Sequence, residues 1–84
     1  MLYELKFTGW NENLKKVSFV RVLRQRGDMT LHAAKSVLDS LLINEDVSLE
    51  ITDINTAQKI RKETTKLGAK SQIIEVSHSE KLIA

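Results

Sequence analysis

Three segments of the chain carry the pattern of β-strands. Apolar and polar side chains alternate over residues 1–9, with Tyr3 and Phe7 on the apolar side, as in a strand with one buried face. The same alternation over 47–51 predicts a second strand. β-Branched residues are frequent over 72–76, and this enrichment predicts a third strand.

The segment 15–27 is predicted to be the first helix. Asn11 or Asn13 is suited to cap its amino end, because either side chain can accept a hydrogen bond from a free backbone N–H group. Gly27 is suited to end the helix. Trp10, in the turn before it, is expected to pack over the edge of the core, and an anchor for a binding partner is the alternative.

This first helix has two apolar sides. On a helical wheel of about 100° per residue, Phe19, Val22 and Leu23 form one core-facing stripe. A different side combines two valines with three cations: Lys16, Val17, Val20, Arg21 and Arg24. A helix needs only one apolar stripe to dock on a small domain, so the second side predicts a contact surface for another molecule.

A second helix is predicted from an amino-terminal cap at Asp28 or Thr30 to about Ile43. Apolar residues at helical spacing predict a single buried face for this helix. These residues are Leu31, Ala34, Leu38, Leu41 and Leu42.

A third helix is predicted between a cap at Asp53 and Gly68, because glycine takes the left-handed conformation that often ends a helix. Its buried face is expected to contain Ala57, Ile60, Thr64 and Leu67. The order of elements is then strand, helix, helix, strand, helix, strand, which predicts an α+β fold.

The composition fits one small domain. The chain has 84 residues, of which 42% are hydrophobic and 29% charged, enough for a single core. No repeat or linker interrupts the pattern, so we expect a single domain over 1–76 and a polar tail over 77–84. The formal net charge of +2 permits an acidic protein or a nucleic acid as partner without requiring either.

The residue types that are missing narrow the possibilities further. The chain has no cysteine, which excludes disulfides and thiolate metal sites. Because it also lacks a signal-like amino terminus, we expect a cytoplasmic protein. The longest apolar run, Leu41–Ile43, is far shorter than the roughly 20 residues of a membrane helix, so no membrane span is expected.

The segments KKVSFVRVLRQRGDMTLHAAKSVLDSLL and TAQKIRKETTKLGAK, in this order of elements, resemble the C-terminal domain of the bacterial ribosomal stalk protein. The resemblance runs from Tyr3 to Val76 and is most specific from Lys16 to Ser40. It implies a three-stranded antiparallel sheet covered on one side by three helices. It also implies a non-enzymatic domain that binds translation GTPases, such as elongation factors, through its first two helices.

The resemblance further implies which residues contact the partner. The positions that match are Lys16, Val17, Val20, Arg21, Arg24 and Lys35. Five of these six belong to the second side of the first helix. The stalk family's glycine-rich turn between the two helices is replaced here by the segment 27–30. Its dimerisation segment and hinge are not found in the chain, so a free-standing domain is expected. The related adaptor of the Clp protease is a weaker match, because its acidic stretch is missing around 9–13.

Two other classes of function stay open. The first is an immunity-type inhibitor or adaptor that binds and blocks one enzyme through the same or another face. The second is binding to the nucleic-acid backbone through cations on and after the third helix. These cations are Lys59, Arg61, Lys62, Lys66 and Lys70. No aromatic residues are interleaved with them to stack on bases.

Catalysis and cofactors find little support in the sequence. His32 and Ser36 are four residues apart on the second helix, but no carboxylate is placed to orient the histidine. His78 is the only other histidine, and no spacing of ligands suggests a metal site. We therefore expect neither a catalytic residue, nor a metal, nor a cofactor.

Overall fold

The computed structural model describes residues 2–76. Its elements in chain order are β1 Leu2–Trp10, α1 Lys16–Arg26, α2 Leu31–Leu42, β2 Val47–Ile51, α3 Ile54–Leu67 and β3 Ala69–Val76. This order confirms the predicted α+β fold. The predicted tail over 77–84 lies outside the described residues.

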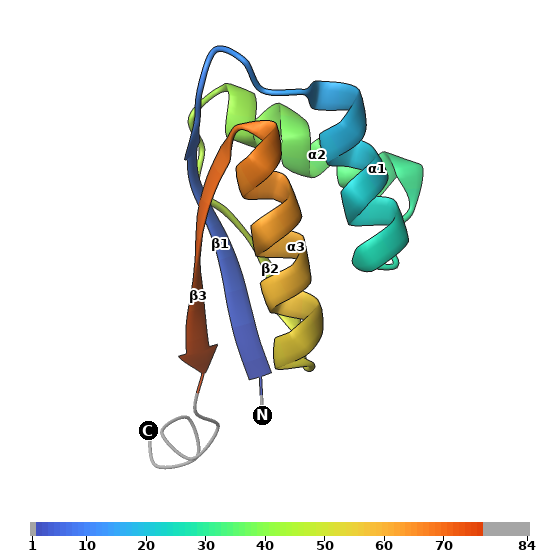
Figure 1. The fold of residues 1–84 in the computed structure, drawn as a ribbon, viewed down its shortest axis with the longest axis vertical. Coiled ribbons are helices and arrows are strands. Elements are labelled where there is room, and N and C mark those ends of the chain that lie inside the picture. The colour runs from blue at the N-terminus through green and yellow to red at the C-terminus, as the bar shows by residue number, and fades with distance from the viewer. Residues whose placement is uncertain (1, 77–84) are drawn as a thin grey trace.

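The three strands form one antiparallel sheet with the order β2-β1-β3, so the first strand is the central one. The helices lie on one side of this sheet, as expected (Figure 1). α1 packs mainly against α2 and α3 and lies on the right of the view in Figure 1, away from the sheet. Much of its surface is therefore left without a neighbour.

The core lies between the sheet and the helices. Leu5 and Phe7 of β1 are fully buried, and so are Phe19 and Leu23 of α1. The rings of Phe7 and Phe19 meet edge to face, with centroids 5.3 Å apart and planes at 68°. Each such side chain stabilises the fold by roughly 1.5–3 kcal/mol through burial, and an aromatic pair adds about 0.5–1.5 kcal/mol.

The amino end of α1 is held by backbone contacts instead of the expected asparagine cap. Lys15 is the cap residue, and its side chain makes no capping hydrogen bond. Its backbone N–H donates to the carbonyl of Leu67, at 2.9 Å. The Asn11 side chain accepts from the N–H of Asn13 within the turn, at 3.0 Å. The prediction that Asn11 or Asn13 caps this helix was wrong, because the end of α3 already fixes where α1 begins.

The predicted caps of the other two helices are confirmed. The Thr30 hydroxyl accepts from the N–H of Ala33, at 3.1 Å, and Asp53 accepts from the N–H of Asn55, also at 3.1 Å. Gly27 ends α1 as expected, although it stays in the right-handed region, and Asp28 takes the left-handed conformation with φ 52°.

The third strand is longer than predicted. It begins at Ala69, directly after α3, where the sequence predicts a start near residue 72. Ala69 pairs with Trp10 of β1, and a register shift separates this pair from the regular pairing at Phe7. This irregularity turns Trp10 toward the core, which it contacts as a partly buried side chain, in agreement with the expectation. If successive side chains after Phe7 had alternated strictly, Trp10 would point to the open face of the sheet, the face without helices.

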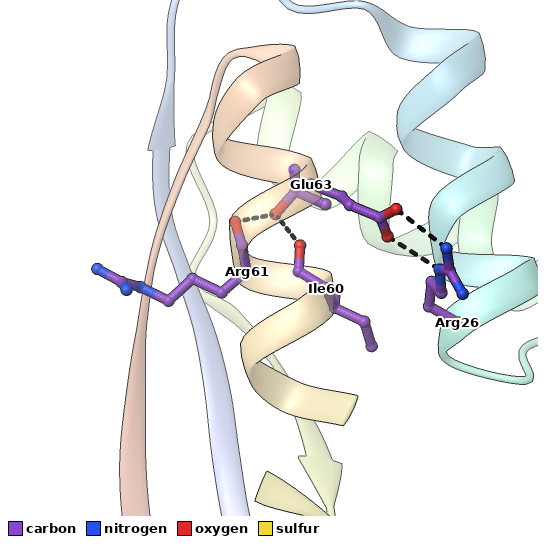
Figure 2. A network of polar contacts seen from close by, with 5 residues as sticks. Arg26, Ile60, Arg61 and Glu63 are labelled. Atoms are coloured by element: carbon purple, nitrogen blue, oxygen red, sulfur yellow. Dashed lines mark hydrogen bonds and ion pairs between the residues drawn. The ribbon is translucent and has the colours of Figure 1, made fainter. Parts of the chain in front are cut away.

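An ion pair joins the end of α1 to the middle of α3. Arg26 Nε lies 3.1 Å from Oε2 of Glu63, and Arg26 Nη2 lies 3.3 Å from Oε1 (Figure 2). Beside it, the buried Thr64 hydroxyl donates to the carbonyl of Ile60, at 2.7 Å. Thr64 is thus the one polar residue among residues 2–76 that is buried as a whole, and its hydroxyl is hydrogen-bonded within its own helix, whereas the buried Oγ atom of Ser71 has no hydrogen-bond partner.

The Arg26–Glu63 pair is expected to contribute little stability. The two side chains are 50% and 36% exposed, so water and salt weaken their attraction. A double-mutant cycle with Arg26→Met and Glu63→Gln is expected to give a coupling free energy of about 0.5 kcal/mol in urea unfolding. The coupling should shrink in high salt. A coupling above about 2 kcal/mol would contradict this account.

Gly68 combines a left-handed backbone with close neighbours. Its φ is 110°, and a Cβ atom there would lie 2.7 Å from Asn11 Oδ1 and 3.0 Å from the Cα of Leu14. Gly68→Ala is therefore expected to lower the free energy of unfolding by about 2 kcal/mol. Gly9→Ala is the matched control, since its Cβ would meet only the flexible end of Lys70, at 3.7 Å. Urea unfolding followed by Trp10 fluorescence checks both, and equal effects would contradict the assignment.

Candidate protein-binding site

Two adjoining hollows lie between α1 and α2, with volumes of about 470 Å³ and 460 Å³. Val17, Val20 and Leu31 line both hollows, so the two form one continuous groove, named here the α1–α2 groove. The other lining residues are Arg21, Arg24, Gln25 and Met29 in the first hollow and Lys16, Lys35, Leu38 and Asp39 in the second.

All six residues that the sequence and the resemblance singled out line this groove. They are Lys16, Val17, Val20, Arg21, Arg24 and Lys35. Five come from α1 and the sixth from α2, so the packing of the two helices brings them together. Val17 is 75% exposed, the largest value among the exposed large hydrophobic residues of the described chain. The second side of α1, with the exception of Val20, is therefore left open by the fold.

The exposure of Val20 is lower than predicted. The sequence groups it with the exposed contact residues, but only 9% of it is exposed, and it belongs to the core cluster. On the helical wheel it stands about 100° from the buried Phe19, at the border between the two sides of α1. Val20 is thus the floor of the groove and a structural residue at the same time.

The exposure of Leu31 is higher than predicted. The sequence places it on the buried face of α2, yet it is 44% exposed. It is the first residue of α2, and the buried face of that helix begins one turn later, at Ala34. The exposed Leu31 therefore extends the apolar floor of the groove beyond α1.

Sequence reasoning missed five groove residues as members of the site: Gln25, Met29, Leu31, Leu38 and Asp39. For Met29 a signal was present, because it is the one apolar side chain in the polar segment between the helices. The place of Leu38 and Asp39 depends on how α2 crosses α1, which no local pattern specifies.

The rim of the groove is positively charged. Four cations face a single carboxylate, that of Asp39, which gives a formal charge of four minus one, or +3. Ion pairs within residues 2–76 involve only Lys6 with Asp46 and Arg26 with Glu63, so the four groove cations have no acidic partner there. An apolar floor with cations around it suits a partner that offers apolar side chains beside carboxylates.

The cations of α3 do not form the single cluster that the sequence suggests. Lys59 and Lys62 line two shallow hollows on α3, and Lys66 lines one of them. Arg61 instead donates to the backbone of β3 at Ser71, and Lys70 lies on β3 itself. A nucleic-acid backbone would therefore meet three lysines in line instead of five.

Two of the residues considered for chemistry, His32 and Ser36, lie on α2. His32 and Ser36 are both exposed, and no hydrogen bond of the described chain joins them. Within residues 2–76 there is no group of three or more side chains that could hold a metal ion. His78 lies outside the described residues. None of the helices in the described part is long and apolar enough to cross a membrane.

Comparison with protein-family models and with curated protein sequences gave no match to this chain. The resemblance to the ribosomal stalk domain therefore stays a hypothesis, based on the residues quoted for it.

The same substitution is expected to affect stability differently at the two valines of the groove. Val17→Asp is expected to change the free energy of unfolding by less than about 0.5 kcal/mol, because the new carboxylate stays in water. Val20→Asp is expected to lower it by about 3 kcal/mol or more, because it would bury a charge without a partner. Urea unfolding followed by Trp10 fluorescence measures both. Similar stability of the two variants would mean that α1 is rotated from the orientation described.

Proposed function

We propose that this chain is a non-enzymatic protein-binding domain and that a protein partner docks in the α1–α2 groove. The observation that supports this most is the position of the six predicted contact residues, all of which line that groove. Five of the six were selected on two independent grounds, the second apolar side of α1 and the resemblance, and Lys35 was selected by the resemblance alone.

The groove has the composition of a modest docking site. Exposed apolar residues, above all Val17 and Leu31, supply contact area that gains from leaving water. The cations on the rim orient the partner and raise the rate of association. A partner segment with apolar residues on one side and carboxylates beside them, such as an acidic amphipathic helix, fits this arrangement.

The leading candidate for the partner is a translation GTPase, and the resemblance to the stalk domain is the reason. An immunity-type inhibitor or adaptor would use the same kind of contact to block one enzyme. Where the inhibitor or adaptor uses this groove and not another face, the two possibilities differ only in the partner. Experiments on the groove therefore have to be kept separate from experiments on the partner's identity.

A charge reversal tests the translation candidate. Purified elongation factors, loaded with a non-hydrolysable GTP analogue, are titrated with the native chain and with Arg21→Glu in calorimetry. We expect Arg21→Glu to raise Kd at least about tenfold, which corresponds to about 1.4 kcal/mol. Lys62→Glu is the matched control, since this exposed lysine lies on α3 outside the groove, and its Kd should stay within about twofold. Equal weakening by both variants would indicate a general attraction of charges instead of groove docking.

A capture experiment tests the groove without assuming a partner. The native chain, Val17→Asp and Ile43→Asp are used as baits in cell extract, and bound proteins are quantified by mass spectrometry. Ile43 is a suitable control because it is 65% exposed and does not line the groove. We expect Val17→Asp to lose the partner and Ile43→Asp to keep it. Retention by Val17→Asp would contradict the proposed site, and a captured enzyme unrelated to translation would favour the inhibitor class.

A further inference from the structure

The sheet has two free edges, one on β2 and one on β3. The outer side of an edge strand presents backbone N–H and C=O groups that no neighbouring strand pairs with, and another polypeptide can use them. The two edges of this sheet are not equivalent.

One backbone group near the start of β3 is bound by a side chain. Arg61 Nε, on α3, donates to the carbonyl oxygen of Ser71 at 3.3 Å. In Figure 2 the Arg61 side chain runs from α3 across the ribbon of β3. A strand approaching β3 at Ser71 would meet a guanidinium group, and charged side chains at an edge are a common protection against added strands.

The edge of β2 has no such cover. Within residues 2–76, neither a backbone group nor a side chain outside β1 hydrogen-bonds to the backbone of Val47–Ile51. Every second residue of the strand therefore directs an N–H and a C=O group away from the sheet. These groups are free to pair with an added strand.

A groove runs along this edge. It has a volume of about 350 Å³ and is lined by the four consecutive residues 48–51 of β2, together with Gly27 and Met29. Successive side chains of a strand point to opposite faces, so a hollow that touches four residues in a row follows the edge of the strand. Leu49, Ile51 and Met29 are partly buried and give this groove an apolar side.

The charges around the edge select the occupant. Glu50 is directly opposite Glu4 in the sheet, and like charges in this position repel. Neither carboxylate takes part in an ion pair within the described chain. Other exposed acids near the strand are Glu45, Asp46 and Asp53, and of these only Asp46 forms an ion pair within residues 2–76, with Lys6 at 3.9 Å. A cation from outside, placed beside Glu50, would offset the repulsion between the two glutamates.

We infer that the free edge of β2 binds an extended, basic segment of a partner polypeptide as a fourth strand. The backbone of the segment pairs with β2, an apolar side chain fills the hollow beside Met29, and a lysine or arginine lies next to Glu50. The segment needs about five residues, roughly 17 Å of strand, to match β2. This surface is separate from the α1–α2 groove, with which it shares only Met29, and it selects the opposite charge.

A set of synthetic peptides tests strand addition. The probe is fluorescein-labelled acetyl-Lys-Val-Arg-Val-Lys-Val-amide, and its binding to the full chain is followed by fluorescence anisotropy. Two further versions are N-methylated at every second residue, one at the odd positions and the other at the even positions. Each version lacks the backbone N–H donors along one of its two edges. We expect the unmodified peptide to bind and one methylated version to lose at least about tenfold in affinity. Equal binding of all three peptides would overturn strand addition, and so would a failure of the unmodified peptide to bind.

A charge reversal in the chain tests the selection of a basic segment. Glu50→Lys is expected to weaken binding of the basic peptide at least about tenfold. Glu12→Lys, an exposed carboxylate in the turn before α1, is the matched control and should leave the affinity within about twofold. Trp10 fluorescence shows whether each variant is folded. Equal weakening by both variants, or no weakening by Glu50→Lys in a folded protein, would overturn the placement at β2.

Discussion

The edge-to-face contact between Phe7 and Phe19 fixes the orientation of α1, and the rest of the account depends on that orientation. α1 lies mainly on the other two helices, and Phe19 links it to the central strand of the sheet. Once Phe19 points inward, the turn of about 100° per residue places Val17 and Arg21 on the far side and Val20 at the border. The exposure of Val17 follows from this contact, whereas the burial of Val20 depends in addition on the helices that pack beside α1.

The same orientation produces the α1–α2 groove and its charge. The outward side of α1 carries three of the four groove cations, and α2 supplies Lys35. On another part of the surface, β2 and its flanking turns carry exposed carboxylates. A chain whose positive and negative charges are nearly equal in number thus has one cationic surface and one acidic surface. Met29, in the Gly27–Thr30 loop, lines both the α1–α2 groove and the groove beside β2, so this loop lies between the two surfaces. Total charge conceals this division, because the two surfaces nearly cancel in the sum.

Local patterns predicted much of the fold. The caps at Thr30 and Asp53 and the left-handed Gly68 depend on neighbouring residues alone, and all three are confirmed. The asparagine cap of α1 failed because a distant element, the end of α3, determines where α1 begins. Leu31 and Val20 failed for a related reason, since a helical wheel gives the direction of a side chain and not what lies beside it. The binding role of the six groove residues remains a prediction, because their shared surface fits a partner but does not identify one.

Mapping the contact by nuclear magnetic resonance tests the central claim most directly. The ¹⁵N-labelled chain is titrated with an unlabelled elongation factor, or with the protein captured from extract, and the amide signals are followed residue by residue. We predict that signals of Val17, Leu31 and Lys35 shift or broaden first, while those of Lys59 and Lys62 on α3 stay in place. Changes confined to α3 or to the open face of the sheet, with the groove unaffected, would contradict the claim that the α1–α2 groove binds the partner.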